Sequence, residues 1–349
     1  MNKRRWMLGL RTVAIAAIAT GLWFFIRELD FGQLEIAFRT AKLWPLILAA
    51  VLNFACLYGK AACWHIMLAP RFRVPISRLT RYTIAAFAAS AIAPARAGEV
   101  LRVWVLKRRE GVPAADTAAV ALSEKLLDSI TMLLICAPLP WLVPGLPGWV
   151  GGSMAACAGV AVGIFIGLYI AVGRIDASRE GSSWLERFIA GMHVLRSPKR
   201  LFASLAVLVL VWAVDLGMVL LSAYSVGISL SPVEGLLILF TLNLTIAVPS
   251  TPAQVGALEV GALAALRLLH VPDEPALAFA LLYHVLQVIP LLIAGLALEL
   301  RLVLGREPAM AQVIATKDAD LVCSVESAAR AADPEASNVV DIASKRIAR

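Results

Sequence analysis

Three charged residues occur within seven positions of a largely apolar stretch of the chain: Arg96, Glu99 and Arg102. The planar guanidinium group of arginine can hold a phosphate with two hydrogen bonds, which suits it to an anionic headgroup. We expect these side chains to surround a hydrated cavity that receives the headgroup of a lipid. The alternative interpretation is an ion pair between Glu99 and Arg102, which lie one helical turn apart, at the membrane interface.

Two acidic residues, Glu124 and Asp128, lie one helical turn apart farther along the chain, 11 and 15 positions after Pro113. Carboxylates this deep in an apolar segment must face protein or water, because burying a charge in hydrocarbon costs on the order of 3 kcal/mol. They could neutralise Arg96 or Arg102, bind a cationic headgroup or carry a proton. A purely structural charge network is the alternative.

Polar residues recur at the matching distance from a second proline, Pro272. Counting from it, the positions that correspond to the two acids fall on Tyr283-His284 and on Gln287. His284 and Gln287 are therefore candidate site residues. The alternative for His284 is a hydrogen-bonded histidine of the protein interior, which is the more common role.

Two apolar segments are broken by the same pattern, a proline followed four residues later by a glycine. The first break reads Pro94-Ala-Arg-Ala-Gly98 and the second reads Pro252-Ala-Gln-Val-Gly256. Proline removes a helical hydrogen bond and glycine permits unusual backbone angles, so each break marks a turn. In membrane transporters, broken hydrophobic segments at matching positions in two halves point to the substrate site.

The second break is followed by an acidic residue, Glu259. A half-helix that begins near Gln254 would aim its positive end and its free amides at an anionic group. Asn243, in the arm before the break, could line the same pocket. Arg267 is the one nearby residue in the sequence that could serve as a basic partner for Glu259.

The composition is that of a membrane protein. Apolar residues make up 60% of the 349 residues, charged residues make up 16%, and the mean hydropathy is +0.81, outside the range of globular proteins. About 20 helical residues cross the hydrocarbon core of a bilayer. Runs of this kind predict six spans, near 7–26, 44–68, 114–142, 150–173, 201–224 and 275–304. A cleaved signal peptide is the alternative for the first run, although its apolar character continues through Ile26.

The net charge of +8 is distributed as membrane topology requires. Lysine and arginine gather in the segments 71–81, 107–109 and 174–200, whereas 143–149 and 226–233 contain neither. This alternation follows the positive-inside rule. Nucleic-acid binding would require a basic groove with interleaved aromatic residues, which the sequence does not contain, so we expect no nucleic-acid partner.

The basic clusters on both sides of segment 79–107 predict that it enters and leaves the membrane on the cytoplasmic side, as a re-entrant helical hairpin. Segment 234–269 is expected to form a second re-entrant hairpin from the opposite side. Two short spans are the alternative for this second segment. Both chain termini are expected in the cytoplasm.

We therefore predict an all-α polytopic membrane protein with about six transmembrane helices and two re-entrant hairpins in an inverted repeat. The transmembrane domain is expected to cover 1–305, with inverted halves at about 7–142 and 150–304. The segment 306–349 is polar and lacks sustained periodicity, so we expect a largely disordered cytoplasmic tail.

The sequence contains no pattern for catalysis or cofactor binding. We find no phosphate-binding glycine loop, no metal-ligand spacing and no nucleophile–base pair. The five cysteines are odd in number, and we expect buried hydrophobic roles for them. We expect no catalytic residue, no metal and no cofactor, and hence a protein that is not an enzyme.

Two blocks of sequence resemble the lysylphosphatidylglycerol synthase transmembrane-region (flippase-like) family. The first is Pro94-Ala-Arg-Ala-Gly98-Glu99-Val-Leu-Arg102, followed by Glu124 and Asp128, and the second runs from Val248 to Glu259. The resemblance implies a polytopic membrane protein associated with moving modified lipids between leaflets. Some members carry a fused aminoacyl-transfer domain, which these 349 residues do not contain.

The resemblance also implies a set of candidate pathway residues, namely Arg96, Glu99, Arg102, Glu124, Asp128, Pro249, Pro252, Gly256 and Glu259. The family commonly has a Gly-Gly pair after the second proline, where this chain has Ala253-Gln254. Because of this departure, the flexibility of the turn and the headgroup preference of the family are not carried over to this chain.

We therefore expect a transporter in the bacterial inner (plasma) membrane that moves a polar-headgroup lipid between leaflets. A phospholipid, an aminoacyl-lipid, a glycolipid and a hopanoid-type lipid all fit this expectation, and a separate lipid-modifying enzyme is a candidate partner. Two alternatives stay open. One is a membrane-embedded transferase with Glu124 or Asp128 as general base, and the other is a non-catalytic partner in an envelope-lipid complex.

Overall fold

The computed structural model describes residues 39, 41–69, 71–92, 97–143, 145–174, 184–246 and 252–304, whose secondary structure is helical with no strand. The all-α prediction is therefore confirmed. The chain divides into two units, Met1–Leu298 and Glu299–Arg349. Five of the predicted features lie outside the described residues, namely the span 7–26, the tail 306–349, Pro94, Arg96 and Pro249.

Five long helices coincide with five of the six predicted spans. They are α3 (Leu43–Leu68), α6 (Ala114–Cys136), α8 (Gly148–Arg174), α10 (Pro198–Ser225) and α13 (Asp273–Leu304). Within the described residues, α3, α8, α10 and α13 contain the four stretches that are long and apolar enough to cross a membrane. Helix α6 has 23 residues but includes four charged ones. It also ends earlier than predicted, and the short helix α7 (Leu139–Leu142) completes the expected span 114–142.

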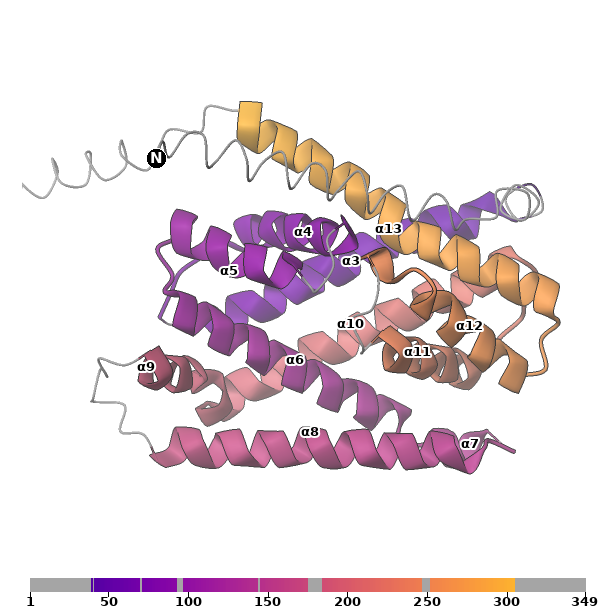
Figure 1. The fold of residues 1–349 in the computed structure, drawn as a ribbon, viewed down its shortest axis with the longest axis horizontal. Coiled ribbons are helices and arrows are strands. Elements are labelled where there is room, and N and C mark those ends of the chain that lie inside the picture. The colour runs from indigo at the N-terminus through magenta and orange to yellow at the C-terminus, as the bar shows by residue number, and fades with distance from the viewer. Residues whose placement is uncertain are drawn as a thin grey trace, which may run out of the picture. The chain divides into compact units, whose positions relative to one another are not determined.

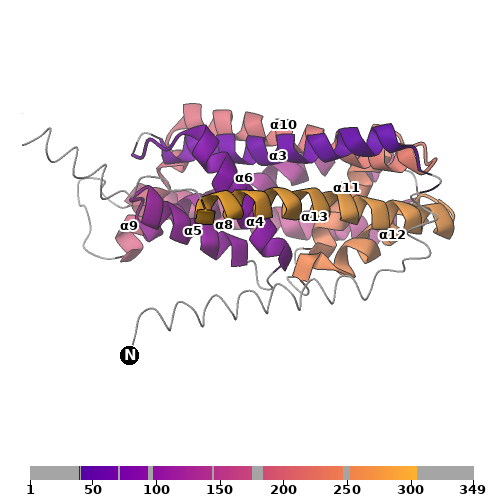
Figure 2. The same ribbon diagram turned by 90° about the horizontal axis from the view of Figure 1, so that it is seen from above.

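Helices α3 and α10 pack side by side in antiparallel directions (Figure 1 and Figure 2). The backbone N–H of Lys42 donates to the carbonyl oxygen of Ser225 at 2.9 Å, which joins the start of α3 to the end of α10. Farther along, Cys56 Sγ lies 3.6 Å from the carbonyl oxygen of Val211. The 26 residues of α3 make a helix about 39 Å long, so the pair has two well-separated ends.

The first predicted hairpin consists of two short antiparallel helices, α4 (Ile76–Ile92) and α5 (Ala97–Arg109), which we call hairpin 1. Glu110, directly after α5, accepts hydrogen bonds from the Tyr82 hydroxyl at 2.7 Å and from Arg78 at 3.0 Å. Both donors lie near the start of α4. The base of hairpin 1 therefore lies at the end of the α3–α10 pair where α3 ends.

Hairpin 2 consists of α11 (Pro232–Ile246), the 3₁₀ turn η2 (Pro252–Gln254) and α12 (Ala257–Leu268). It begins after α10 ends, so its base lies at the opposite end of the α3–α10 pair from that of hairpin 1 (Figure 1). Its two arms contain 15 and 12 residues, fewer than the roughly 20 that cross a bilayer.

The described ends of the two hairpins, Ala91 in hairpin 1 and Ala253–Val255 in hairpin 2, which we call their tips, meet between these opposite ends. Ala253 and Val255, in the tip of hairpin 2, pack in one apolar cluster with Ala91, near the end of α4. Val288 and Leu292 of α13 complete this cluster. Segments that start from opposite ends of the α3–α10 pair thus share a contact, and α13 lies against that contact.

The tip of hairpin 2 contains two residues with a left-handed backbone, Ala253 with φ 53° and Gln254 with φ 65°. This conformation costs a residue with a side chain roughly 1–2 kcal/mol, whereas glycine adopts it readily. Ala253 and Gln254 stand where the family resemblance leads us to expect glycine. The chain therefore forms this left-handed turn with residues other than glycine, and the backbone of the turn is strained.

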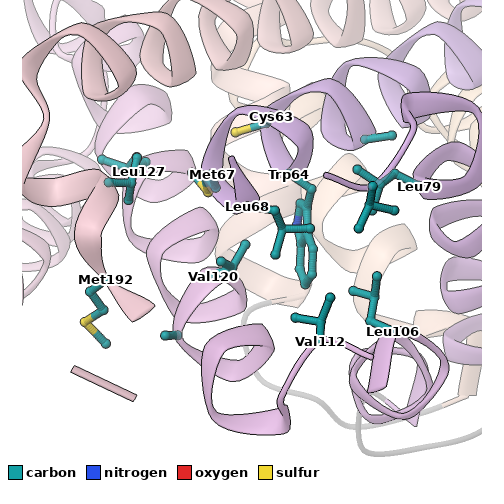
Figure 3. Close-up of a cluster of buried hydrophobic side chains, with 14 of the residues drawn as sticks. Cys63, Trp64, Met67, Leu68, Leu79, Leu106, Val112, Val120, Leu127 and Met192 are labelled. Carbon is teal, nitrogen blue, oxygen red and sulfur yellow. The ribbon is translucent and has the colours of Figure 1, made fainter. Parts of the chain in front are cut away.

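A buried apolar core fixes α3 against hairpin 1 and α6. Trp64 of α3 lies in this core with Leu79 of α4 and Leu106 of α5 (Figure 3). The core extends to η1 (His193–Arg196), which follows α9 (Trp184–Gly191). Because lipid tails are as apolar as these side chains, close packing rather than removal from water holds such helices together.

Gly98 allows the close approach of α5 to α4, since a Cβ added there would lie 1.7 Å from the carbonyl oxygen of Ala86. We predict that Gly98→Ala destabilises the folded protein by about 2 kcal/mol, because the two backbones would have to move apart. The matched control is Gly152→Ala in α8, where an added Cβ meets nothing within 4 Å. Thermal unfolding in detergent measures both variants, and equal unfolding temperatures would contradict this packing.

Candidate functional site

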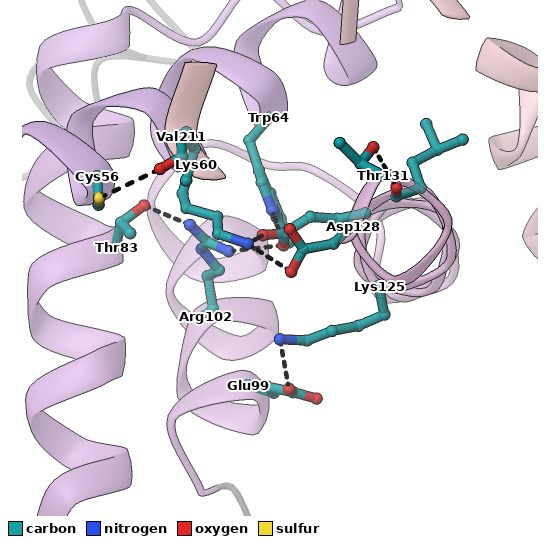
Figure 4. Close-up of polar contacts among 12 residues, drawn as sticks. Cys56, Lys60, Trp64, Thr83, Glu99, Arg102, Lys125, Asp128, Thr131 and Val211 are labelled. Atoms are coloured by element: carbon teal, nitrogen blue, oxygen red, sulfur yellow. Dashed lines mark hydrogen bonds and ion pairs between the residues drawn. The ribbon is translucent and has the colours of Figure 1, made fainter. Parts of the chain in front are cut away.

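Four charged side chains from three helices meet in the interior, and we call them the central charge cluster: Lys60, Arg102, Glu124 and Asp128 (Figure 4). Lys60 Nζ lies 2.6 Å from Asp128 Oδ2 and 3.8 Å from Glu124 Oε1. The Arg102 guanidinium donates to Glu124 Oε2 at 3.3 Å, and the indole N–H of Trp64 donates to the same oxygen. Two cations and an indole thus hold the Glu124 carboxylate.

Helical spacing explains how these residues come together. Glu124 and Asp128 are four positions apart, so both project from one face of α6. Lys60 and Trp64 are four positions apart on α3, and both contact that face. Arg102 reaches the same point from α5. The cluster therefore joins hairpin 1 to the two long helices that flank it.

Arg102 is enclosed by protein and is 5% exposed. Its guanidinium lies 3.9 Å from the ring centroid of Trp64, a cation–π contact, and it donates to Thr83 Oγ1 of α4. Among the described residues, Arg102 Nε has no acceptor and Asp128 Oδ1 has no donor. Buried polar atoms that the protein leaves without a partner mark places for water or a ligand.

Glu99 forms an ion pair with α6 at the edge of the central charge cluster (Figure 4). Its Oε1 lies 3.4 Å from Lys125 Nζ, and the two side chains are 43% and 42% exposed. Hairpin 1 is therefore tied to α6 twice, once by this half-exposed pair and once by the buried pair Arg102–Glu124. Of the roles considered for Glu124, neutralisation of Arg102 is the contact observed.

A second group of polar contacts, which we call the tip clamp, holds the tip of hairpin 2: Ala253, Gly256, Glu259 and His284. His284 of α13 contacts Glu259 Oε1 through Nδ1, and its Nε2 lies 2.9 Å from the carbonyl oxygen of Ala253. The other oxygen of Glu259 accepts the N–H of Gly256 at 2.8 Å, which caps α12. One histidine thus fastens both the tip and the start of α12 to α13.

A third polar contact links α13 to α10. The Tyr283 hydroxyl lies 3.4 Å from Asp215 Oδ1, and Gln287 Nε2 donates to the same hydroxyl at 2.9 Å. Asp215, isolated in the sequence of its helix, therefore has a partner. Gln287 lies beside the tip clamp on α13 but contacts Tyr283.

The two hairpins are joined to long helices at corresponding positions. Glu124 lies 11 residues after Pro113 and contacts Arg102 of hairpin 1. His284 lies 12 residues after Pro272 and contacts Glu259 of hairpin 2. In the first pair the acid is on the long helix, and in the second pair it is on the hairpin. The two polar contacts correspond in position, with the acidic and the basic residue exchanged between long helix and hairpin.

Comparison with protein families gives a match over most of the chain. The sequence profile of one family, described as Lysylphosphatidylglycerol synthase TM region, matches residues 11–295. The chain belongs to this family. With its long apolar helices, this lysylphosphatidylglycerol synthase TM-region protein is an integral membrane protein. A search of curated proteins found no match.

Several sequence-based expectations for hairpin 2 require correction. Helix α12 begins at Ala257 rather than near Gln254, because the left-handed turn intervenes. The partner of Glu259 is His284, whereas Arg267 pairs with Asp273 at 2.9 Å.

Three further candidates of hairpin 2 have different surroundings. The Asn243 amide donates to the carbonyl oxygen of Leu239 within α11. Gln254 is exposed at the tip, and Pro252 begins η2.

Two residues at the central charge cluster were not identified from the sequence, namely Lys60 and Trp64, which contacts Glu124. Lys60 is a lysine inside the apolar run 44–68, and an ionisable residue at such a position is itself a sign of a buried partner. Trp64 could be recognised from its spacing, because it lies one helical turn after Lys60. Neither residue lies near the two proline–glycine breaks, from which the candidate site residues were inferred.

In this lysylphosphatidylglycerol synthase TM-region protein, we predict that Glu124→Gln lowers the free energy of unfolding by about 3 kcal/mol. Lys60 and Arg102 would remain buried with one carboxylate fewer. The control is Arg267→Gln, which removes an ion pair whose side chains are 65% and 70% exposed and should change stability by less than about 1 kcal/mol. Unfolding in detergent measures both, and equal losses would contradict the assigned role of Glu124.

Proposed function

We propose that this protein is a lipid transporter of the bacterial inner membrane, which moves a polar-headgroup lipid between leaflets. The observation that carries the proposal is the meeting of the two hairpin tips, Ala91 with Ala253 and Val255, between the ends of the α3–α10 pair. In transporters, interrupted helices that meet near the bilayer midplane surround the substrate site. Family membership supports a lipid-related role.

We further propose that both hairpins are re-entrant and that the two halves form an inverted repeat of six spans with two hairpins. The short arms of the hairpins and their bases at opposite ends of the α3–α10 pair support this topology. The basic segments 71–81 and 107–109 lie at the base of hairpin 1, which favours the cytoplasmic side for it. Both chain termini are then cytoplasmic.

Polar groups of the central charge cluster would lower the cost of moving a headgroup through the membrane. An unpartnered polar group in hydrocarbon is costly, and side chains can replace the water that the headgroup leaves behind. Arg102 Nε offers a donor and Asp128 Oδ1 an acceptor, neither with a partner among the described residues. Such a pair suits phospholipids, aminoacyl-lipids, glycolipids and hopanoid-type lipids with polar groups of either kind.

The proposed function contains no covalent step. Glu124 is engaged by Lys60, Arg102 and Trp64, so it is poorly placed to remove a proton from a substrate as a general base. This geometry disfavours Glu124 as the base of the transferase alternative. A separate lipid-modifying enzyme would then supply any modified lipid. Mass spectrometry of lipids incubated with the purified protein tests this point, since a changed mass would identify an enzyme.

Leaflet exchange in reconstituted vesicles tests the proposal. Vesicles would carry labelled lipids with anionic, zwitterionic or glycosylated headgroups, and the protein is expected to accelerate exchange of at least one class over protein-free vesicles. Arg102→Lys keeps the charge but removes the Nε–H and the planar fork, and should slow exchange of a phosphate-bearing lipid roughly tenfold. No acceleration for any headgroup would contradict the proposal.

A further inference from the structure

Both ring nitrogens of the buried His284 face oxygen atoms of hairpin 2, the carbonyl of Ala253 and the carboxylate of Glu259. We propose that His284 and Glu259 form a proton-binding site that locks the tip of hairpin 2. Lipid movement is then coupled to the uptake and release of one proton. The coupling rests on the proposed transport function, whereas the proton site does not.

The number of protons on the His284–Glu259 pair follows from the hydrogen-bond partners of the two ring nitrogens. A carbonyl oxygen only accepts hydrogen bonds, so Nε2 of His284 must carry a hydrogen to bond Ala253. The contact between Nδ1 and Glu259 then needs one more hydrogen, either on the ring as an imidazolium or on the carboxyl as a neutral acid. Both arrangements hold one proton more than a neutral histidine beside a carboxylate. The closed clamp therefore requires that proton.

The surroundings of the pair are defined by the elements packed against it. Glu259 faces His284 from α12, and the tip presents the Ala253 carbonyl. On α13 itself, the neighbouring Tyr283 directs its hydroxyl to Asp215 of α10. The proton is therefore shared between His284 and Glu259, with Asp215 occupied by a different partner.

The clamp holds a strained segment. Ala253, whose carbonyl bonds His284, and Gln254 both have left-handed backbones, which residues with side chains rarely adopt. Backbone strain of this kind persists only where surrounding contacts fix it, and it is common in switching segments. If the bond from His284 is lost, the tip can relax.

Loss of the proton would separate the hairpin tips. When it leaves to water, the pair can keep Nε2–H to Ala253 only by setting a bare Nδ1 against a carboxylate, which is repulsive. The tip turn that packs on Ala91 of hairpin 1 then loses its anchor. The tips are expected to stay together as pH falls and to separate as pH rises, with the proton exchanged once per opening.

The matched variant is Glu259→Gln, which imitates the protonated pair. The amide oxygen can accept from Gly256, as Glu259 does, while the amide NH₂ donates to Nδ1 of a neutral His284. This variant needs no proton to stay closed. Ala253→Gly is a second variant, which removes the strain and should keep the tip closed at a higher pH than the unaltered chain does.

Nitrogen-15 NMR of histidine-labelled protein in lipid nanodiscs tests the site without any lipid assay. The Nδ1 signal of His284, assigned by its loss in His284→Asn, should change as the pH is raised and the proton between Nδ1 and Glu259 leaves. In Glu259→Gln the ring should remain neutral with hydrogen on Nε2 throughout. An Nδ1 signal of the unaltered protein that does not change over the whole pH range would overturn the proposal.

Leaflet exchange against pH tests the coupling. Exchange by the unaltered protein should rise with pH, by at most about tenfold per unit for release of one proton, and should be slow and independent of pH in Glu259→Gln. Exchange that is equally fast at every pH in both proteins would overturn the coupling. If no protein exchanges lipid while His284 still titrates, the proton site stands and the transport function fails.

Discussion

Charges and broken backbone cannot be left facing hydrocarbon, and both hairpins of this protein are built around that constraint. In hairpin 1, Arg102 is neutralised by Glu124 of the long helix α6. In hairpin 2, His284 of the long helix α13 bonds the Ala253 carbonyl and contacts Glu259. Each interrupted segment is thus tied to a continuous helix by a polar contact. Such a contact can open only if water or a headgroup replaces one of the partners, or if the proton that joins the partners leaves.

The two contacts differ in chemistry, and this difference gives the halves different roles. An arginine stays charged at any physiological pH, so hairpin 1 is anchored permanently by Arg102, which Trp64 and Thr83 also hold. Histidine changes charge near neutral pH, so hairpin 2 is anchored by a group that can release. The strained turn at Ala253 lies on the side that can release. In the proposed transport cycle, hairpin 1 is therefore the fixed part and hairpin 2 the moving part.

Much of the fold could be predicted from the sequence, because its long helices are apolar runs and its turns carry proline and glycine. The partners of the buried charges could not be predicted as well. Lys60 meets Asp128 only because α3 packs on α6, and local spacing does not contain that contact. His284 and Glu259 are 25 positions apart and meet because α13 returns along hairpin 2. The positive φ of Ala253 was hidden because no glycine marks it.

The central claim is that the hairpin tips must separate for a lipid to pass, and cross-linking them tests it most directly. Cysteines would replace Ala91 and Val255, which share the apolar contact of the tips, in a chain without its native cysteines. A short cleavable thiol cross-linker should stop leaflet exchange, and cleavage should restore it. A cross-link between Cys56, restored, and Val211→Cys in the α3–α10 pair should leave exchange unchanged. Undiminished exchange with the tips cross-linked would contradict the account.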